Sequence, residues 1–420
     1  MNNDRKQLIP DLRFSEFVND ADWNVKELNK LFNVFRGGVF SKKDIDVNGK
    51  KNCIHYGELF TKYNETIFKI ISRSNKTNPF TSKVGDVLMP SSDVTPTGLA
   101  KASALMVDDV ILGGDMNILR PKVEINSIFV SYLLNYSQNE IIKLVSGTTV
   151  KHIYPSQIIN LSLPITPNFF EQQKIASCLS SLDELITAQK EKLELLKNHK
   201  KGLMQNLFPQ EGETVPKFRF PEFENDRDWE KKKLESLSKR GSGHTPNKQF
   251  PEYYNGGVNW VSLSDSKKLD NGYIYETNIQ ISMSGVKNSS AVLHPAGTVI
   301  LSRDAGVGKS AVLNSEMAVS QHFIAWVCDE SSLSNWFLYY ILQILKPVFE
   351  NIAVGSTIKT IGIPYFKELR IAIPLISEQK KIAETLLSVD NLISAQTEKI
   401  EKLQLHKKGL MQGLFPKIID

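Results

Sequence analysis

The stretch from Glu171 to Pro209 reads EQQKIASCLSSLDELITAQKEKLELLKNHKKGLMQNLFP. Nearly the same string, EQKKIAETLLSVDNLISAQTEKIEKLQLHKKGLMQGLFP, returns from Glu378 to Pro416. The two strings align without a gap at an offset of 207 residues, and 26 of the 39 aligned positions are identical. Identity of this extent over a contiguous stretch indicates an internal duplication.

Each string has apolar residues at alternating steps of four and three, which is the period of a coiled-coil seam. A helix packed on a globular core usually has a wider apolar face. An amphipathic surface helix is the alternative for one copy alone, but two copies in the same phase favour mutual pairing. The predicted interface positions are Ile175, Leu179, Leu182, Ile186, Gln189, Leu193, Leu196 and Leu203, and Ile382, Leu386, Val389, Ile393, Gln396, Ile400, Leu403 and Leu410, with Lys200 and Lys407 at the remaining seam positions.

The charges within each string predict how the two helices pair. The first half of each helix carries acidic residues, and the last turns carry Lys-Lys pairs at 200–201 and 407–408. Antiparallel pairing sets each acidic half beside a basic end, and it brings the central Gln189 and Gln396 within about one layer of each other. A helix of this length spans roughly 55 Å, so the pair would hold the parts attached to its ends at a fixed distance from each other.

The duplication continues outside the helices. Residues 10–23 (PDLRFSEFVNDADW) and 216–229 (PKFRFPEFENDRDW) share Arg-Phe-x-Glu-Phe and the closing Asp-x-Asp-Trp, and we call them the leading segments. Each half of the chain is therefore a leading segment, a divergent region and a seam helix. Two repeats indicate a pseudo-dimer made within one chain, because a solenoid generally needs three or more.

The divergent regions predict an α+β fold, because strand-like runs alternate with helical runs at 127–145 and 333–349, and Gly and Pro punctuate many loops. The chain as a whole is thus predicted to hold two mixed α/β domains separated by two long helices. The predicted segments are a first domain at 1–166, a first spacer helix within 167–210, a second domain at 211–375 and a second spacer helix within 376–420.

Composition narrows the class of protein without deciding the function. Hydrophobic residues make up 41% of the chain, no apolar run reaches membrane-spanning length, and the first residues lack an apolar signal region, so we expect a cytoplasmic protein with no membrane partner. Cys53, Cys178 and Cys328 lack metal-ligand spacing, so they predict buried free thiols and no metal site. The net charge of +5 permits a polyanionic partner but does not prove one.

One short motif recurs after the helical run of each divergent region. Gly-Thr-Thr-Val-Lys-His-Ile at 147–153 matches Gly-Ser-Thr-Ile-Lys-Thr-Ile at 355–361, and we call these the glycine loops. Hydroxyls, free N–H groups and a lysine beside glycine could bind phosphate, whereas a helix-ending glycine with solvated neighbours is the alternative. The motif is retained in both halves while the flanking sequence diverges, which favours a shared role. The candidate DNA-binding residues are Thr148, Thr149 and Lys151, and Ser356, Thr357 and Lys359.

A second glycine-rich stretch, Arg303–Ser310, superficially suggests a nucleotide-binding loop. A phosphate-cradling loop needs glycine five residues before Gly308, where this chain has Arg303. We therefore predict a basic loop whose Arg303 and Lys309 lie near DNA, with a solvated loop as the alternative. Neither Asn-Pro-Pro-Tyr nor Asp-Pro-Pro-Tyr nor a glycine-rich methyl-donor loop occurs, and no set of side chains predicts catalysis.

Two divergent domains alternating with two near-identical seam helices resemble the specificity subunits of type I restriction-modification systems. The resemblance covers essentially the whole chain. The motifs that carry it are the Glu-Gln-x-Lys-Ile-Ala opening and Lys-Lys-Gly-Leu-Met-Gln-x-Leu-Phe-Pro ending of each helix, the Arg-Phe-x-Glu-Phe segments, and the phrases at 55–63, 241–246 and 258–260. The resemblance implies target-recognition domains that each read half of a split DNA site. It also implies an antiparallel coiled-coil spacer that docks modification subunits.

The resemblance further implies the partners, namely double-stranded DNA, two modification (methyltransferase) subunits and restriction subunits. S-adenosylmethionine, ATP and Mg would then be bound by those partners, and this chain would bind no cofactor and catalyse no reaction. Because the two domains differ in sequence, the whole DNA site should be asymmetric. The alternatives are a coiled-coil scaffold without DNA recognition, which leaves two large divergent domains unexplained, and a fused methyltransferase, which would need the missing methyl-donor loop.

Overall fold

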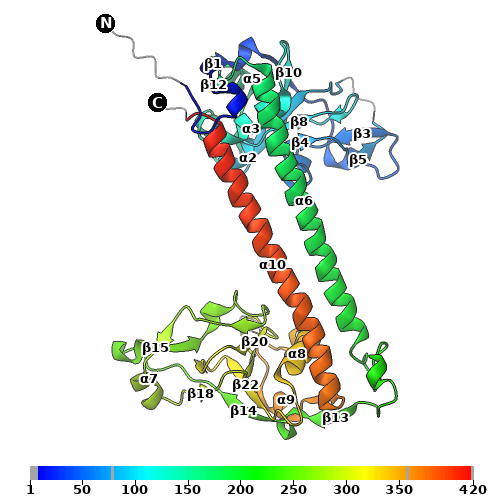
Figure 1. Cartoon of the computed structure of the whole chain (residues 1–420), viewed down its shortest axis with the longest axis vertical. Helices are drawn as coiled ribbons and strands as arrows, with labels where there is room; N and C mark the ends of the chain where they lie inside the picture. The colour runs from blue at the N-terminus through cyan, green and yellow to red at the C-terminus, as the bar shows by residue number, and fades with distance from the viewer. Residues whose placement is uncertain (1–7, 77–79, 356–358, 418–420) are drawn as a thin grey trace. The chain divides into compact units, whose positions relative to one another are not determined.

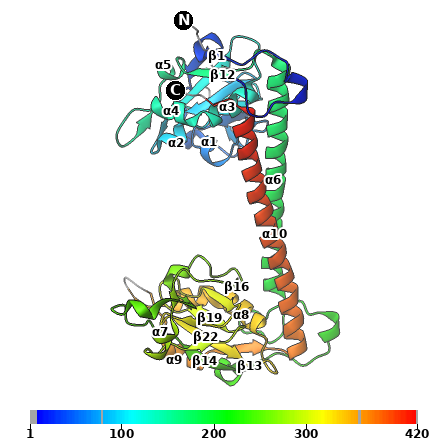
Figure 2. The ribbon, with the colours of Figure 1, turned by 60° about the vertical axis from the view of Figure 1, so that its left-hand side comes forward.

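The computed structural model describes residues 8–76, 80–355 and 359–417. The chain divides into two compact units, which Figures 1 and 2 show as ribbons. Unit 1 combines residues up to Lys190 with those from Lys399 onward, and unit 2 spans Glu191–Glu398. The long helices α6 (Phe169–Asn206) and α10 (Ile376–Leu414) therefore each contribute one part to each unit. No helix in the described ranges is long and apolar enough to cross a membrane.

Unit 1 is built on a five-stranded sheet in the order β2-β10-β6-β8-β4. All neighbours are antiparallel except β4 and β8. Smaller sheets join β5-β3-β9, β1-β12 and β11-β7. The strands are β1 Asn24–Glu27, β2 Phe32–Arg36, β3 Lys51–Ile54, β4 Thr66–Ile67, β5 Ser72–Ser74, β6 Asp86–Pro90, β7 Ser92–Asp93, β8 Ser103–Leu105, β9 Ile111–Leu112, β10 Met116–Pro121, β11 Lys151–His152 and β12 Ser162–Ile165. The helices are α1 Glu58–Thr61, α2 Pro96–Leu99, α3 Ser127–Tyr136, α4 Gln138–Lys143 and α5 Pro155–Ile158, with 3-10 turns η1 Ser15–Phe17, η2 Leu28–Lys30 and η3 Lys42–Asp44.

Unit 2 repeats the five-stranded sheet in the order β14-β22-β19-β20-β16, again with one parallel pair at the β16 edge. It adds a four-stranded sheet, β17-β15-β21-β18, and the pair β13-β23. The strands are β13 Glu230–Lys233, β14 Ser238–Ser242, β15 Tyr254–Val261, β16 Tyr273–Ile274, β17 Gln280–Ile281, β18 Leu293–His294, β19 Val299–Ser302, β20 Ser310–Leu313, β21 Met317–Val319, β22 Phe323–Cys328 and β23 Arg370–Ile373. The helices are α7 Met283–Lys287, α8 Asn335–Ile352 and α9 Ile363–Glu368, with 3-10 turns η4 Pro221–Phe223, η5 Leu234–Ser236, η6 Pro251–Tyr253 and η7 Leu263–Asp265.

The Glu-Gln pair that opens each long helix fastens the helix to its domain. In unit 1 the Gln172 side chain accepts a hydrogen bond from the Asn126 backbone N–H (2.9 Å) and donates one to the Thr166 carbonyl (3.0 Å). In unit 2 Gln379 bonds equivalently to the Ser334 N–H and the Pro374 carbonyl, each at 3.0 Å. The start of each helix is therefore tied to the first turn of the domain helix α3 or α8.

The Leu-Phe-Pro motif that ends each long helix supplies core to a domain. Phe415, after α10, packs against Trp23 and Phe129 in unit 1, with ring centroids 6.2 and 5.7 Å apart. Phe208, after α6, packs against Trp229 and Phe337 in unit 2, at 6.0 and 5.4 Å. Each unit thus contains the beginning of one long helix and the end of the other, which Figures 1 and 2 show side by side for unit 1.

The two predicted helical runs are found with altered limits. The run at 127–145 is two helices, α3 and α4, because the backbone of Ser137 leaves helical geometry at φ −85° and ψ 28°. The run at 333–349 is one helix, α8, which continues to Ile352 with Pro347 inside it.

All three cysteines are free thiols, but the prediction that all are buried was wrong. Cys53 is buried, whereas Cys178 and Cys328 are only partly covered. Burial raises the pKa of Cys53 to about 11 and that of Cys328 to about 12. Both thiols are therefore held in the protonated, weakly nucleophilic form at neutral pH.

Candidate nucleic-acid interface

The glycine loops at 147–153 and 355–361 share one local geometry. In unit 1 the backbones of Ser146 and His152 exchange two hydrogen bonds of 3.0 and 2.8 Å. In unit 2 Val354 and Thr360 exchange two of 3.1 and 2.9 Å. Each loop is therefore pinched at its base. Ser356 and Thr357 lie outside the described residues.

Each glycine loop also pairs with the segment that follows a central strand of its sheet. In unit 1, β11 pairs with β7, and the Ile153 N–H donates to the Ser91 carbonyl at 3.1 Å. In unit 2, Thr360 pairs with Asp304, and the Ile361 N–H donates to the Arg303 carbonyl at 3.0 Å. The structure thus brings Arg303 beside the second glycine loop, a proximity that the sequence did not predict.

The three candidates of unit 1 lie at the surface. Thr148 and Thr149 are exposed at the tip of the loop, and Lys151 is half-buried at its base. The Lys151 ammonium donates to the Gly147 carbonyl at 2.7 Å, which leaves two N–H donors for another acceptor. Gly147 has φ 103°, and a Cβ there would lie 2.3 Å from the Val150 carbonyl oxygen, so this position requires glycine.

The candidates of unit 2 are more strongly engaged with the protein. The Arg303 guanidinium donates to the backbone carbonyls of Gln321 and Ile361, both at 3.3 Å. The Lys309 ammonium donates to the carbonyl and hydroxyl oxygens of Ser266, at 2.9 and 3.2 Å. Lys359 is exposed. Arg303 and Lys309 therefore hold loops in place, and of the three side chains Lys359 presents the most accessible charge.

A cluster around Asp304 joins the Arg303–Ser310 stretch to the second glycine loop. Its carboxylate accepts hydrogen bonds from the Thr360 hydroxyl and from His322 Nδ1, the latter at 2.9 Å. The stretch itself connects β19 to β20. A phosphate-cradling loop leads from a strand into a helix, so the fold agrees with the rejection of a nucleotide-binding loop.

Four exposed lysines around β3 were not singled out from the sequence. Lys42 and Lys43 precede the strand, and Lys50 and Lys51 stand at its start, all exposed. Their spacing of two Lys-Lys pairs within ten residues was the available signal. They add positive charge to the surface of unit 1, of the kind that contacts phosphates.

Each domain is bound to both long helices by a Tyr–Asp–Lys triad. In unit 1 the Tyr132 hydroxyl donates to Asp183 at 2.6 Å, and the Lys407 ammonium lies 2.7 Å from the same carboxylate. Lys407 also contacts Glu65 at 2.8 Å and lies over the Tyr132 ring at 5.2 Å. Burial, reinforced by Glu65, raises the pKa of Asp183 above its usual range.

Unit 2 repeats the triad with Tyr340, Asp390 and Lys200. The Tyr340 hydroxyl donates to Asp390 at 2.8 Å, and the Lys200 ammonium lies 2.5 Å from that carboxylate and 5.5 Å from the Tyr340 ring centroid. Burial, followed by the charge of Asp390, raises the pKa of the Tyr340 hydroxyl. The two seam positions that are lysine therefore meet an acid on the other long helix.

The remaining seam residues are covered to different degrees. Buried positions are Ile175, Leu179, Ile186, Ile382, Leu386, Val389, Gln396 and Ile400, and half-buried positions are Leu182, Gln189, Leu193, Leu196, Leu203, Ile393, Leu403 and Leu410. Within unit 1, Ile175 and Leu410 belong to one apolar cluster, and within unit 2 so do Leu203 and Ile382. The predicted layer of Gln189 with Gln396 stays a prediction. Among the described residues, no group of His, Cys, Asp and Glu could hold a metal ion.

Comparison with known proteins defines the class. The family model described as the type I restriction modification DNA specificity domain matches residues 20–198 and 226–405. A putative type I restriction enzyme specificity subunit (MjaX) of Methanocaldococcus jannaschii is 25% identical over 409 residues, covering 94% of this chain and 93% of that protein. The MjaVIII specificity subunit of the same organism is also 25% identical, covering 73% of each chain.

Solved structures show the same fold. The crystal structure of a type I restriction-modification S subunit from M. genitalium aligns with a TM-score of 0.65 at 17% identity, covering 98% of this chain and all of that one. A chain from a structural study of complex assembly in the type I system aligns with a TM-score of 0.55 at 16% identity, covering 94% and 98%. This chain, with two DNA target-recognition domains, therefore belongs to the specificity-subunit family of type I restriction-modification systems.

Proposed function

We propose that this chain reads an asymmetric, bipartite DNA site, one half with each domain, for a type I restriction-modification complex. The observation that carries the proposal is the shared junction of both units. In each unit the pinched glycine loop pairs with the segment that follows a central strand of the five-stranded sheet, β6 or β19, while the surrounding sequences diverge. A common frame suits phosphate contacts that set register, and divergent surroundings suit recognition of two different half-sites.

The long helices would form an antiparallel coiled coil with pseudo-twofold symmetry that fixes the distance between the two half-sites. Support comes from the contacts inside each unit, where the beginning of one helix meets the end of the other through Asp183–Lys407 and Asp390–Lys200. Dimeric DNA readers separate half-sites by a comparable fixed geometry. In this arrangement the helix length, and not the sequence of either domain, sets the spacer between the half-sites.

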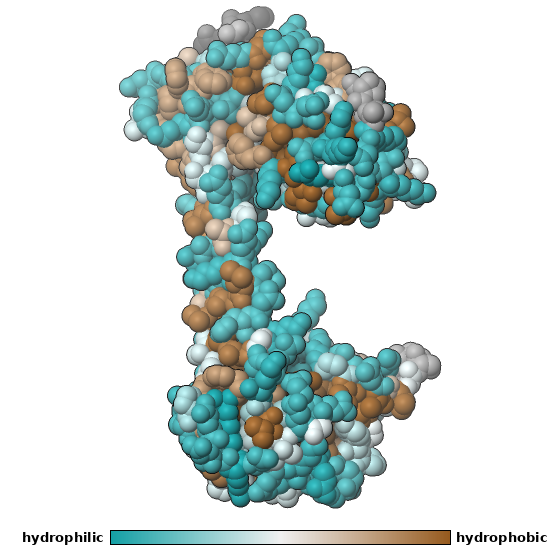
Figure 3. Space-filling model, turned by 90° about the vertical axis from the view of Figure 1, so that its right-hand side faces the viewer, coloured by the Kyte–Doolittle hydropathy of each residue, from teal (hydrophilic) through white to brown (hydrophobic). Residues whose placement is uncertain are grey.

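The helices would also dock two modification subunits, with restriction subunits joining the assembly. Support comes from leucines off the predicted seam: Leu195 and Leu405 are each 69% exposed, and Leu392 is 55% exposed. Figure 3 shows hydrophobic side chains on the exposed surface of the helices. A docked partner that covers these leucines would remove their apolar surface from water.

Methyl transfer and cleavage would be performed by those partners, which would also bind S-adenosylmethionine, ATP and Mg. The chain would supply positioning, in that its domains place the target base within reach of a docked methyltransferase. Its own polar clusters, such as Asp304 with His322 and Thr360, are satisfied by hydrogen bonds that join loops.

The decisive experiment combines the purified chain with its cognate modification subunit and maps methylated bases on a plasmid library. We expect one interrupted, asymmetric motif. A control chain that lacks the second domain but keeps both helices should lose one half of that motif. A scaffold without DNA recognition would give methylation independent of this chain, or no change in DNA affinity when the chain is added.

A further inference from the structure

Two grooves occupy equivalent places in the two units. Each lies between the end of a long helix and the helix that covers the five-stranded sheet. The long-helix wall is nearly the same in both, because it comes from the repeated Lys-Lys-Gly-Leu-Met-Gln motif at 407–412 and 200–205. The grooves therefore differ mainly in the wall contributed by the domain.

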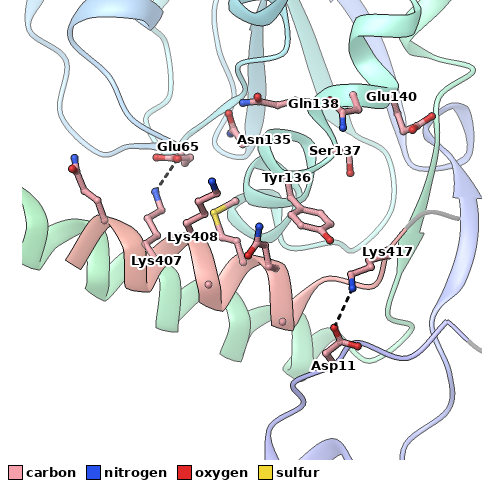
Figure 4. A pocket seen from close by; sticks show the side chains of 16 residues that line it. Asp11, Glu65, Asn135, Tyr136, Ser137, Gln138, Glu140, Lys407, Lys408 and Lys417 are labelled. Carbon is pink, nitrogen blue, oxygen red and sulfur yellow. Dashed lines mark hydrogen bonds and ion pairs between the residues drawn. The ribbon is translucent and has the colours of Figure 1, made fainter. Parts of the chain in front are cut away.

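The groove of unit 1, with a volume of about 980 Å³, has a polar domain wall. Ser137, Gln138 and Glu140 line it, and Figure 4 shows them across the pocket from Lys407 and Lys408 of α10. Ion pairs of Lys407 with Glu65 (2.8 Å) and of Lys417 with Asp11 (3.7 Å) neutralise part of its charge. Tyr136 is the one large ring in this wall, and the other domain side chains that line the groove are polar.

The groove of unit 2, with a volume of about 670 Å³, has an apolar domain wall. Where unit 1 has Ser137 and Glu140, the corresponding positions 208 residues later are Leu345 and Val348. Phe208 and Ile371 add to its apolar lining. Unit 2 therefore exposes apolar side chains where unit 1 has polar ones. Covering this apolar surface with a partner would favour binding, because it removes the surface from water.

The apolar wall continues along α8 beyond the groove. Ile344, Val348 and Ile352 follow one another at four-residue steps and are 36%, 45% and 37% exposed. Side chains at this spacing form a ridge on one helix face. A ridge extending over more than two turns is too long for a compact small molecule and matches the length of a partner helix.

The rim of the unit 2 groove is basic. Lys201, Lys231 and Arg370 line it, are exposed, and form no ion pair with any residue in the described ranges. Glu211 and Glu213 also line the groove. Three free cations around an apolar floor favour an occupant that is apolar on one face and acidic at its flanks. A nucleic acid would match the cations but not the floor.

We propose that the unit 2 groove binds an amphipathic protein helix with a Leu, Ile or Phe ridge and flanking Asp or Glu, and that the equivalent unit 1 groove does not. The helix lays its apolar ridge against Ile344 and Val348 while its acids pair with Lys231 and Arg370. The duplicated chain would thereby have this partner site in unit 2 only. This inference does not depend on the proposed DNA function.

The probe is a fluorescent peptide of about 18 residues, five turns of helix, with leucines at i, i+4 and i+7 and glutamates beside them. Titration of the full chain, followed by anisotropy, should show one peptide per chain. The same peptide with lysine in place of glutamate should bind at least about tenfold more weakly. Raising the salt concentration should reduce the difference in affinity between the two peptides, because salt screens the exposed charges of the rim.

Three variants locate the site. Val348→Glu, which copies the residue of unit 1 at that place, should weaken binding of the acidic peptide at least about tenfold. Lys231→Glu/Arg370→Glu, on the exposed rim, should abolish the preference for the acidic peptide without disturbing the core. Val292→Glu, at an apolar residue that is 50% exposed and does not line the groove, is the matched control and should leave peptide binding unchanged.

Grafting the apolar wall onto unit 1 tests the asymmetry. Unit 1 has Val25 and Ser162 where unit 2 has Lys231 and Arg370, so the graft also needs these two cations. Ser137→Leu/Glu140→Val combined with Val25→Lys/Ser162→Arg should raise the stoichiometry from one peptide to two, provided that the variant keeps the wild-type melting profile. The proposal is overturned if Val348→Glu melts like wild type and binds the peptide unchanged, or if the basic peptide binds as tightly as the acidic one. The proposal is also overturned if duplex DNA displaces the peptide from this groove and if substitution in the apolar ridge does not change peptide binding.

Discussion

Arg13 and Glu171 form a two-pronged ion pair that joins the first leading segment to the start of α6. The Arg13 guanidinium donates to the two carboxylate oxygens at 2.7 and 2.9 Å, and the side chains are only 7% and 1% exposed. Arg219 and Glu378 repeat the pair in unit 2 with the same exposures. Hydrogen bonding to Glu171 raises the pKa of Arg13 further above neutrality, so the pair stays charged.

Removing one partner of this pair should destabilise unit 1 strongly. Arg13→Met leaves the Glu171 carboxylate buried with only the Thr166 hydroxyl as a side-chain partner, and breaking a buried pair in this way costs about 3–5 kcal/mol. Urea unfolding of the full chain would measure the loss. Lys174→Ala, which removes an exposed pair with Glu16, is the control and should leave the unfolding midpoint nearly unchanged. Equal losses in the two variants would contradict the role given to burial.

The Tyr–Asp–Lys triads should differ in their sensitivity to loss of the acid. Asp390→Asn leaves Lys200 without a carboxylate, whereas Asp183→Asn leaves Lys407 paired with Glu65. We therefore expect Asp390→Asn to cost about 1.5–3 kcal/mol, and Asp183→Asn to cost less. Calorimetric unfolding of both variants beside the wild type would test the order, and a larger loss for Asp183→Asn would show that Glu65 does not compensate.

Asp183 also predicts a pH dependence of stability. Its pKa is raised in the folded chain, so between the ordinary aspartate pKa and the raised value the folded state holds more protons than the unfolded state. The contribution of this group to the free energy of unfolding therefore falls as pH rises through that window. Subtracting the profile of Asp183→Asn from that of the wild type between about pH 4 and about pH 7 isolates it. A difference that rises with pH would contradict the burial argument.

The seam helices and the duplicated frame could be predicted because they rest on local periodicity and on repetition. The role of the repeated Glu-Gln opening could not be predicted, because Glu171 pairs with Arg13, which is 158 residues away in the sequence. The contact between Arg303 and Ile361 could not be predicted either, because these residues are 58 positions apart in the sequence. Charge at Arg303 and Lys309 suggested DNA contact, but the sequence cannot show that oxygen atoms of the protein already occupy some of their donors.

Disulfide trapping should establish the polarity of the helix pair. Cysteines introduced at Ile175 and Leu410, which share the apolar cluster of unit 1, should crosslink efficiently after mild oxidation. The pair at Ile175 and Ile382 joins two helix beginnings and is the matched control. Mobility on a non-reducing gel gives the result. Efficient crosslinking of the control pair instead would require parallel helices.

Neutralising the lysines of the glycine loops should weaken DNA binding without changing its sequence preference. Lys151→Gln and Lys359→Gln each remove one charge from equivalent loops, so each should lower the salt slope of binding by about one. Because Lys151 also donates to the Gly147 carbonyl, its variant needs a melting control. Lys309→Gln, whose ammonium is held by Ser266, should leave the slope unchanged. A changed base preference with an unchanged slope would disprove the phosphate role.

A half-length chain ending just after Pro209 should work as a homodimer with its modification partner. Unit 1 requires Leu414 and Phe415 from the end of α10, and α6 ends in the same Leu-Phe-Pro sequence. A second copy can therefore place its Phe208 between Trp23 and Phe129, and its Lys200 beside Asp183. Two identical domains about a twofold axis must read identical half-sites in inverted orientation.

Methylation mapping with this fragment should therefore reveal an interrupted palindrome whose half matches the first half of the native site. Phe208→Ala removes the side chain that would replace Phe415 in the core, so it should give a monomer that modifies nothing. Phe170→Ala, at a 71% exposed position of α6, is the matched control and should leave the dimer intact. Modification of the unchanged asymmetric site by the fragment would contradict the assignment of one half-site to each domain. A monomeric wild-type fragment would show that contacts of the second domain are needed to hold the helices together.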